Sequence, residues 1–454
     1  MKENDEFILD IKRLGINGEG IGFYNKLTIF VDDAIPGEGH NVKIEKLEKN
    51  LAYAKSLEIK HKSPDRIEPL CKHYYECGGC QVMHINYEKM LEYKRDLVIE
   101  AIKKYTKLNP KSFEIYPTIP SDKTLGYRNR SILPIKEGLD TKLHVCMIKQ
   151  NTNYLTAIDT CVVQDPLIND INNKIIDIAN QMHLKAYVQK YNRGLLRFIS
   201  IRVNRKNEAL VTLICGEKNA KIKELAKEVS KIPGVKGVYE NFNLEKKSIN
   251  PFGEETNHLF GDEYIIENLG DIQYKIYPTT FFQLNTLQAE KLVETVKKVS
   301  KLSRNEIVID AYCGVGAIGL YLAKNVKEVI GIENNKEAVL AAKDNAKLNK
   351  INNAKFYQGD SINLIPKIIE DNKDVKEFTL IVDPPRTGLD EKLIECINNS
   401  SIRRIIYISC NPATLAKDIN LLSDNYKVNL MNPLDLFPYT SHTECITVLS
   451  KKQI

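Results

Sequence analysis

The sequence predicts an α/β protein with a small N-terminal β-barrel, a central α+β domain and a C-terminal domain built on a doubly wound, mainly parallel sheet. Three observations support this prediction. Residues 1–63 show short alternating apolar and polar runs separated by glycines, which is typical of a small five-stranded barrel of the OB type. Residues 64–270 begin with a cysteine cluster and continue mainly as antiparallel strand patterns. In residues 271–454, short buried strands alternate with helices.

The composition is that of an ordinary globular protein. Of the 454 residues, 43% are hydrophobic and 27% are charged, and the net charge of +6 is a weak indication of a polyanionic partner. No apolar run approaches the length of a membrane span, and the charged first residues do not resemble a signal peptide. We therefore expect a cytoplasmic protein with no membrane partner, and the sequence indicates no obligate protein partner.

The N-terminal barrel is a candidate RNA-binding surface. Lysines outnumber acidic residues in its second half, so one face of the barrel is suited to a phosphate backbone. The alternative is a strand edge that lysines protect from pairing with other chains. Composition alone leaves both interpretations open.

Ten cysteines in a cytoplasmic chain indicate metal ligands and a nucleophile rather than disulfides. The strongest local pattern is C-x5-C-x2-C, formed by Cys71, Cys77 and Cys80. Three thiolates need a fourth ligand, and the candidates, the best first, are Cys161, His73 and His84. Thiolates bind zinc or an iron–sulfur cluster, and the spacing leaves these two open.

The central region contains one clear helix and one candidate RNA contact. Residues 85–105 repeat apolar positions at a helical period and predict an amphipathic helix. Further on, Arg128 and Arg130 are predicted to share one face of a strand beside Tyr127. Two arginines with an aromatic ring can hold a phosphate and stack a base; the alternative is an ordinary exposed strand face.

The C-terminal domain begins with the pattern of a nucleotide-binding βαβ unit. An apolar strand ends at Asp310, a loop with Gly314 and Gly316 follows, and a second strand ends at Glu333. Glycines allow close approach of the backbone to a ligand, and an acid at the second strand end binds ribose hydroxyls. The glycine spacing fits a loop that holds S-adenosylmethionine better than the dinucleotide motif.

Two further strand ends carry acids. Asp360 follows a third strand, where it would reach an adenine, and Asp383 opens the loop Asp-Pro-Pro-Arg after a fourth. Amino-methyltransferases use a similar loop but generally carry an aromatic residue after the prolines. Here Arg386 occupies that position, which argues against chemistry on an exocyclic amine.

Cys410 is the candidate nucleophile. It follows the apolar run Ile405–Ile408, which predicts a strand buried on both faces, and Pro412 fits the first turn of a helix. A thiol at this edge lies where ligands bind, and a helix N-terminus is expected to lower its pKa. A lone cysteine is more often a core residue, and Glu444, at the start of the last predicted strand, would alone be a surface charge.

A cysteine nucleophile, a cofactor-binding sheet and a carboxylate base together suit one reaction. Carbon-5 of a pyrimidine is a poor nucleophile until a thiolate adds to carbon-6. After methyl transfer, a base must remove the carbon-5 proton so that the cysteine can leave. Cys410 would be the nucleophile and Glu444 the base, acting on a base extruded from an RNA fold.

At this point the chain resembles bacterial RNA uridine-5-methyltransferases of the class with an N-terminal TRAM barrel and an iron–sulfur cluster. The motifs that carry the resemblance extend over essentially the whole chain: the barrel with PGE, the cysteine pattern, YRNR, FFQLN, DAYCGVG, IEN, DPPR, SCNPATLAKD and DLFPYTSHTE. The resemblance implies a class I, Rossmann-like S-adenosylmethionine methyltransferase domain. It also implies that the helix after the cysteines packs onto that domain.

The resemblance also assigns residues. It implies a 4Fe-4S cluster on Cys71, Cys77, Cys80 and Cys161. Cofactor contacts fall on Gln283, Tyr312, Glu333 and Asp383, with Asp360 in addition. The nucleophile and base fall on Cys410 and Glu444, and Arg128 and Arg130 become more plausible RNA contacts.

The resemblance suggests 23S ribosomal RNA as the target, because enterobacterial tRNA enzymes of this type lack the barrel and the cluster. Transfer RNA remains the alternative, since relatives with the cluster also act on it. Two other classes compete. A cytosine-5-methyltransferase is expected to carry its cysteine in a Pro-Cys pair, which this chain lacks. A non-catalytic RNA-binding or chaperone protein would tolerate loss of Cys410.

Overall fold

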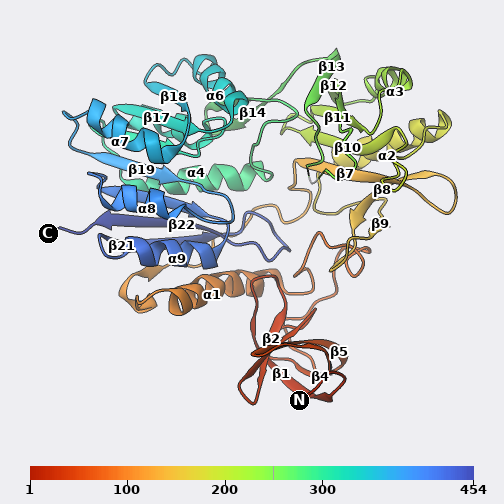
Figure 1. Cartoon of the computed structure of the whole chain (residues 1–454), viewed down its shortest axis with the longest axis horizontal. Helices are drawn as coiled ribbons and strands as arrows, with labels where there is room; N and C mark the ends of the chain where they lie inside the picture. Colours follow the sequence, from red (N-terminus) through yellow and green to blue (C-terminus); the bar gives the residue numbers. More distant parts are fainter. Residues whose placement is uncertain (249, 454) are drawn as a thin grey trace.

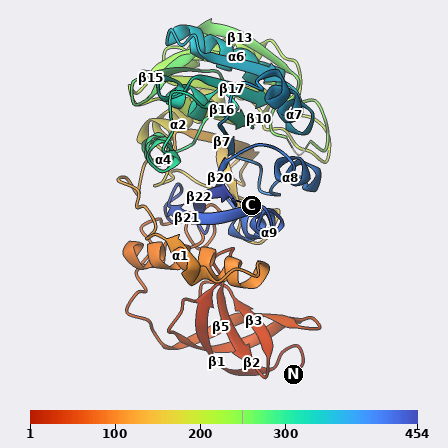
Figure 2. The ribbon, with the colours of Figure 1, turned by 90° about the vertical axis from the view of Figure 1, so that its left-hand side faces the viewer.

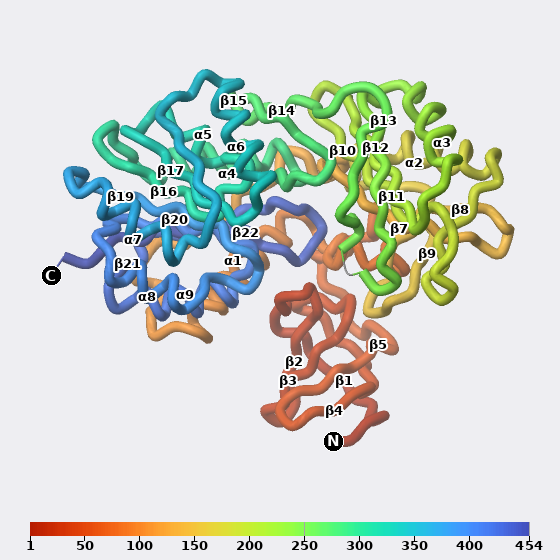
Figure 3. Tube along the Cα trace, turned by 45° about the horizontal axis from the view of Figure 1, so that its top comes forward, coloured from red at the N-terminus to blue at the C-terminus, as the bar shows by residue number. Residues whose placement is uncertain are grey.

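The computed structural model describes residues 1–248 and 250–453. The described chain forms three bodies, a small barrel and two larger α/β bodies that lie side by side (Figure 1). The barrel lies below the junction of the two larger bodies, as the tube trace shows (Figure 3). No helix among residues 1–248 and 250–453 is long and apolar enough to cross a membrane.

The N-terminal body is a closed barrel of five strands in the order β1-β2-β3-β5-β4. Its strands are β1 Glu6–Leu14, β2 Gly20–Tyr24, β3 Leu27–Val31, β4 Gly39–Leu47 and β5 Leu51–His61. Alternate side chains point inward, so that Val42 and Ile44 are fully buried. The predicted small barrel is confirmed.

The central body is a seven-stranded sheet in the order β13-β12-β11-β10-β7-β8-β9. Its strands are β7 Arg130–Glu137, β8 Leu143–Ile148, β9 Leu155–Ala157, β10 Leu196–Val203, β11 Ala209–Cys215, β12 Val235–Phe242 and β13 Glu255–Gly261. Two helices, α2 Pro166–Gln181 and α3 Lys221–Val229, bury their apolar faces against one side of it. The strand pairs are antiparallel, as predicted, except for parallel β11–β12.

The C-terminal body contains an eight-stranded sheet in the order β18-β17-β16-β19-β20-β22-β21-β6. The strands are β6 Glu114–Ile115, β16 Ile307–Ala311, β17 Glu328–Glu333, β18 Ala354–Gln358, β19 Phe378–Val382, β20 Arg404–Ser409, β21 Tyr426–Leu434 and β22 Glu444–Lys451. Strands β16 to β20 run parallel, and β22 runs antiparallel to its neighbours β20 and β21. The strand order reverses between β16 and β19, which is where α/β sheets of this kind bind ligands.

Helices cover both faces of this sheet. One face packs against α4 Thr286–Ser300, α5 Ala317–Leu322 and α6 Lys336–Leu348, together with the hairpin β14 Ile265–Leu269 and β15 Ile272–Ile276. The other face packs against α7 Ser361–Asp371, α8 Glu391–Asn398 and α9 Pro412–Leu422. Two short 3-10 turns, Pro110–Ser112 and Ala323–Asn325, complete the described elements. The doubly wound sheet predicted for this region is confirmed.

A helix from early in the chain completes the second face. Helix α1 Tyr87–Tyr105 begins at Asn86, whose side chain caps it, and buries Val98, Ala101 and Ile102 in the same core as α9. It lies between the barrel and the C-terminal sheet in two perpendicular views (Figures 1 and 2). The segment that follows the cysteines therefore packs onto the C-terminal body, as the resemblance implies.

Candidate active site

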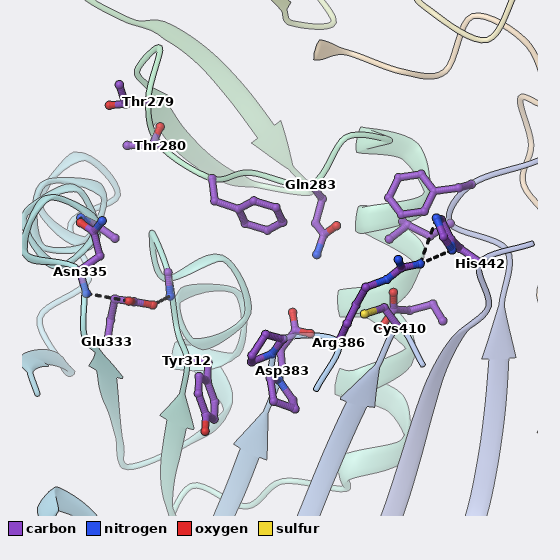
Figure 4. A pocket seen from close by; sticks show the side chains of 18 of the residues that line it. Thr279, Thr280, Gln283, Tyr312, Glu333, Asn335, Asp383, Arg386, Cys410 and His442 are labelled. Atoms are coloured by element: carbon purple, nitrogen blue, oxygen red, sulfur yellow. Dashed lines mark hydrogen bonds between the residues drawn. The ribbon is translucent and has the colours of Figure 1, made fainter. Parts of the chain in front are cut away.

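A pocket of about 580 Å³ opens at the carboxyl ends of the parallel strands. Six of the seven residues proposed for catalysis and cofactor binding line it: Gln283, Tyr312, Glu333, Asp383, Cys410 and Glu444. They come from the segment before α4 and from the ends of β16, β17, β19, β20 and β22. In the close view, Glu333 and Tyr312 occupy one half of the pocket and Cys410 the other, with Asp383 between them (Figure 4).

The first half of the pocket is built from backbone donors around a carboxylate. Tyr312 follows β16 with φ of 67°, a left-handed conformation that is uncommon outside glycine and is often found at functional sites. The chain then turns so that the Gly314 N–H donates to Oε2 of Glu333 over 3.1 Å. The Asn335 N–H donates to Oε1 of Glu333 over 2.8 Å. Glu333 is therefore fixed in one orientation at its strand end.

Asp360 lies outside the main pocket. It caps α7 and accepts a hydrogen bond from the Ile362 N–H over 2.9 Å. It lines an adjoining pocket of about 150 Å³ that shares Tyr312 and Glu333 with the main one. Asp360, which follows β18, thus lies next to the first half of the site but outside the main cavity.

A glycine brings α5 close to the first strand. The Gly319 N–H donates to Oδ2 of Asp310 over 2.9 Å, and Asp310 is buried. A Cβ atom at Gly319 would lie 2.8 Å from Cγ1 of Val329. Burial raises the pKa of Asp310 to about 7. Asp310 therefore holds the start of α5 against β16 and does not line the main pocket.

Cys410 lies where the sequence predicted, between β20 and α9. Asn411 caps α9 by accepting from the Ala413 N–H over 3.0 Å, and Pro412 is the first helical residue. The expected fall in the pKa of Cys410 was wrong. Burial and the carboxylates of Glu444 and Asp383 raise its pKa to about 11, although Arg386 opposes them. These effects outweigh the helix N-terminus.

Glu444 and Asp383 are neighbouring carboxyl groups in the pocket. Glu444 is 6% exposed, and its Oε1 has no hydrogen-bond partner among the described residues. Burial and then the charge of Asp383 raise the pKa of Glu444 well above its ordinary value. Burial raises the pKa of Asp383 to about 7. Glu444 is therefore not the surface charge that its type suggests.

One pair of side chains in the pocket, Arg386 and His442, was not predicted from the sequence. Nη2 of Arg386 contacts Nδ1 of His442 at 2.5 Å and Nε2 at 3.1 Å, above Cys410 (Figure 4). Burial and the charge of Arg386 lower the pKa of His442 to about 4, so the imidazole is neutral. The only sequence signal is that His442 precedes Glu444 by two positions and lies on the pocket side of the loop.

The four proposed cysteine ligands gather outside this pocket. The pKa of Cys80 is raised first by burial and then by the charges of Cys161, Cys77 and Cys71. The four thiols are therefore neighbours. Among residues 1–248 and 250–453, no group of three His, Cys, Asp or Glu side chains is arranged to hold a metal ion.

The two histidines that were alternative ligands have other partners. His73 contacts Asp159 at 2.7 Å, and His84 contacts the hydroxyl of Tyr74 at 2.6 Å. Of the three candidates for a fourth ligand, only Cys161 therefore has no such partner and lies beside the other thiols.

The two arginines lie at the start of β7. Arg130 is the first residue of the strand, while Arg128 forms an isolated bridge with Gln164. Both are partly exposed, whereas Asn129 between them is buried and donates to the carbonyl of Gln283 over 2.9 Å. Arg130 donates to the carbonyl of Pro278 over 2.9 Å, and burial lowers its pKa to about 10.

The fold and the pocket define an S-adenosylmethionine-dependent methyltransferase. Residues 86–452 match the family described as tRNA (uracil-5-)-methyltransferase, and residues 2–57 match the TRAM domain. An RNA methyltransferase of Halalkalibacterium halodurans is 39% identical over 99% of this chain and 97% of its own length. One of Bacillus anthracis is 37% identical over 98% of this chain and 97% of its own length.

A solved structure agrees with these relatives. The tRNA (uracil-54, C5)-methyltransferase of Pyrococcus abyssi, in complex with S-adenosyl-L-homocysteine, aligns with a TM-score of 0.76 at 28% identity. The alignment covers 98% of this chain and 100% of that one. The chain belongs to the tRNA (uracil-5-)-methyltransferase family of RNA methyltransferases and carries an N-terminal TRAM domain.

Proposed function

We propose that the protein transfers the methyl group of S-adenosylmethionine to carbon-5 of a specific uridine in RNA, with Cys410 as nucleophile and Glu444 as base. One observation carries the proposal. A thiol and a buried carboxyl group lie together at one end of a pocket, and its other end holds an acid fixed by two backbone donors.

The first half of the pocket is suited to the methyl donor. An acid at the end of the second strand binds ribose hydroxyls in sheets of this topology, and Glu333 is held there. Tyr312 and Asp383 flank the path from Glu333 to Cys410, and Gln283 reaches in from the segment before α4 (Figure 4). Asp360 completes this set from the adjoining pocket.

The second half carries out the covalent steps. The sulfur of Cys410 adds to carbon-6 of the uracil, and the electron pair of the 5,6 double bond then attacks the methyl group from carbon-5. The bond between the methyl group and the sulfur of S-adenosylmethionine breaks, its electron pair stays on that sulfur, and S-adenosylhomocysteine leaves. Glu444 next accepts the proton of carbon-5. The electron pair of that C–H bond restores the double bond, and the bond between carbon-6 and sulfur breaks. The uridine must leave its stack to enter the pocket.

The raised pKa values of the pocket fit this sequence when both substrates are bound. The pKa of Cys410, about 11, keeps the thiol protonated at neutral pH, and the pKa of Glu444 lies well above its ordinary value. The positive charge of the methyl donor, bound in the same pocket, favours the ionised forms of the carboxyl groups and of the thiol. Arg386 acts on the thiol in the same direction. We infer that the nucleophile and base become competent only after the donor has bound.

We also propose that Cys71, Cys77, Cys80 and Cys161 hold a 4Fe-4S cluster. The support is a donor set of four thiols, three of which contact one apolar cluster with Tyr74, Met83 and Tyr127. Such a cluster is held by four thiolates, and four thiols that lie near one another match this requirement.

Iron and sulfide analysis tests the cluster. Protein prepared without oxygen should contain about four iron atoms and four sulfides per chain, following the stoichiometry of such clusters. Cys161→Ser should lose most of this iron, whereas Cys396→Ser, a half-buried cysteine in α8, should keep it. Stoichiometric zinc in place of iron would contradict the cluster.

Contacts to RNA are proposed for the barrel, Arg128 and Arg130. We propose 23S ribosomal RNA as the target, with tRNA as the second candidate. The tRNA candidate is favoured by the Pyrococcus abyssi enzyme, whose alignment covers 98% of this chain and so extends into the barrel. A barrel therefore does not distinguish the two targets.

Methylation of RNA from an unmodified source tests the function. Ribosomal RNA and tRNA are incubated separately with the protein and labelled S-adenosylmethionine, then digested to nucleosides and identified by mass spectrometry. The proposal predicts label in 5-methyluridine from one of the two RNAs. Label in a cytidine, a ribose or an exocyclic amine would contradict it.

A further inference from the structure

The loop between β21 and β22 ends directly at Glu444, and its position determines where that carboxyl group lies. Residues 435–443 make no regular secondary structure, yet most of them are buried. Asp435 accepts from Nζ of Lys94 in α1 over 2.5 Å and from the hydroxyl of Tyr87 over 2.9 Å. The start of the loop is therefore held by the helix that follows the cysteines.

The end of the loop is held by the segment between and just after the cysteines. The carbonyl of Tyr439 accepts from the N–H groups of Gln81 and Val82, each over 3.1 Å. Oε1 of Gln81 accepts from the Ser441 N–H over 3.4 Å, and Nε2 of Gln81 donates to the carbonyl of Gly78 over 2.9 Å. A single side chain thus connects the turn between Cys77 and Cys80 with a residue three positions before Glu444.

Tyr439 makes the same connection through its ring. Its φ of 64° is left-handed, which a non-glycine residue adopts only when its surroundings hold it there. The ring is buried among Tyr74, Met83 and Tyr127, in the apolar cluster that Cys71, Cys80 and Cys161 also contact. The hydroxyl of Tyr127 donates to the carbonyl of Pro438 over 3.0 Å.

We propose that Gln81 and Tyr439 are positioning residues that set the carboxyl group of Glu444 against the uracil by tethering its loop to the cysteine-containing segment. The proposal rests on the function proposed above. It assigns to the cysteine centre a role at the base, although the cysteines themselves lie outside the pocket.

The tether should affect one chemical step more than the others. Cys410 is carried by β20 and α9, and Glu333 by β17, whereas Glu444 directly follows the tethered loop. Attack by Cys410 is coupled to the loop indirectly, through the contact of His442 with Arg386. Removal of the carbon-5 proton depends on Glu444 alone. A displaced base leaves the methylated uridine attached to Cys410, and the covalent RNA–protein complex should accumulate.

The experiment compares Gln81→Met and Tyr439→Leu with the wild-type enzyme and with Tyr154→Leu. Tyr154 lies in the hairpin on the outer side of the cysteine segment and is 77% exposed, so its variant controls for changes near the cysteines. Four quantities are measured: kcat, KM for RNA, binding of S-adenosylmethionine, and the fraction of protein that remains joined to RNA on a denaturing gel.

The proposal predicts that kcat falls by about tenfold or more in both tether variants, because a misplaced catalytic group costs this much. The joined fraction rises, while KM and donor binding change less than about twofold. Tyr154→Leu behaves as the wild type. If Tyr439→Leu does not fold, Gln81→Met decides the question, since it replaces a half-buried side chain with one of similar size.

Two outcomes overturn the proposal. One is a wild-type kcat and joined fraction in the tether variants. The other is a raised KM at unchanged kcat, which would make the segment an RNA-binding surface. A wild-type enzyme that releases no carbon-5 proton and forms no Cys410-dependent complex would instead refute the proposed function itself.

Discussion

Cys410 lies among groups that oppose its ionisation. Burial, Glu444 and Asp383 raise its pKa to about 11, and the charge of Arg386 acts in the opposite direction. A nucleophile with so high a pKa is almost fully protonated at neutral pH, which protects it from adventitious alkylation and oxidation. Its reactivity must then come from changes in charge when the substrates bind.

Replacing Arg386 should make Cys410 harder to ionise. Arg386→Met removes the cation that lowers the pKa of Cys410, so alkylation of Cys410 by iodoacetamide should require a higher pH than in the wild type. The rate is followed by mass spectrometry of the peptide that contains Cys410. Arg386→Lys keeps the charge and should lie between the two. Identical pH profiles for all three proteins would contradict this role of Arg386.

Because of Glu444, the folded protein should become less stable as the pH rises. Its pKa in the folded protein lies well above the ordinary value of 4.5, first because of burial and then because of Asp383. The folded state therefore keeps this proton when the unfolded chain has lost it. The associated stability is complete below pH 4.5 and is lost as the pH rises toward the folded pKa.

Glu444→Gln carries no such penalty, so it should melt at a higher temperature than the wild type. The difference should grow by up to about 1.4 kcal/mol per pH unit above pH 4.5. Thermal unfolding between pH 5 and pH 8.5 measures it, with Glu370→Gln, an exposed residue of α7, as the control. A difference independent of pH would show that Glu444 is already ionised.

At the scale of single residues, the sequence identified those that end a strand. Cys410, Glu333 and Asp383 each follow an apolar run, and parallel strands bring their carboxyl ends to one edge. The pair of Arg386 and His442 was not predictable, because the two residues are 56 positions apart and meet only through the loop before β22. The direction of the pKa shift of Cys410 was missed because it depends first on burial and then on the charge of Glu444, which lies 34 positions further along the chain.

At the scale of elements, the loop between β16 and α5 shapes the first half of the pocket. The helix can approach β16 and β17 closely because Gly319 has no side chain. An alanine Cβ there would lie 2.8 Å from Cγ1 of Val329 and 2.9 Å from Oδ2 of Asp310. The helix would have to move outward, together with Gly314, which donates to Glu333.

Gly319→Ala should therefore weaken the binding of S-adenosylmethionine by about tenfold, or ~1.4 kcal/mol. Titration calorimetry measures the Kd. Gly39→Ala in β4 is a matched control, because the nearest atom to its added Cβ lies 3.7 Å away. Unchanged donor affinity in Gly319→Ala would mean that this loop does not contact the donor.

At the scale of the whole molecule, one ion pair fastens the barrel to the rest of the chain. Nε of Arg66 contacts Oε1 of Glu38 at 2.6 Å and its Nη2 contacts Oε2 at 2.7 Å, a bidentate pair in which Glu38 is 1% exposed. Arg66 lies between the barrel and the first cysteine. Breaking the pair leaves the charge of Glu38 buried without its partner.

Arg66→Met should loosen this junction. The loss of one partner of a buried pair costs about 3 kcal/mol or more, and limited proteolysis between β5 and Cys71 should accelerate accordingly. Arg304→Met, which changes an exposed arginine before β16, serves as the control. Equal cleavage rates in the two variants would show that other contacts hold the barrel in place.

The sequence predicted the barrel and the C-terminal sheet because each has its own period of apolar residues. Alternation marked the barrel, and buried strands followed by helices marked the C-terminal sheet. How the bodies meet was beyond these patterns. Lys94 and Asp435 are 341 positions apart, and Asn129 and Gln283, which share a hydrogen bond, are 154 positions apart. Such contacts depend on packing between bodies, which periodicity does not encode.

The measurement that tests the central claim most directly is the release of tritium from RNA labelled at carbon-5 of uridine. Unmodified 23S ribosomal RNA and tRNA are each incubated with the protein and S-adenosylmethionine, and tritium in water is compared with methyl uptake. The account predicts one tritium released for each methyl group transferred, from one of the two RNAs, and none from Cys410→Ala. Methyl uptake without tritium release would place the methyl group elsewhere and contradict the roles of Cys410 and Glu444.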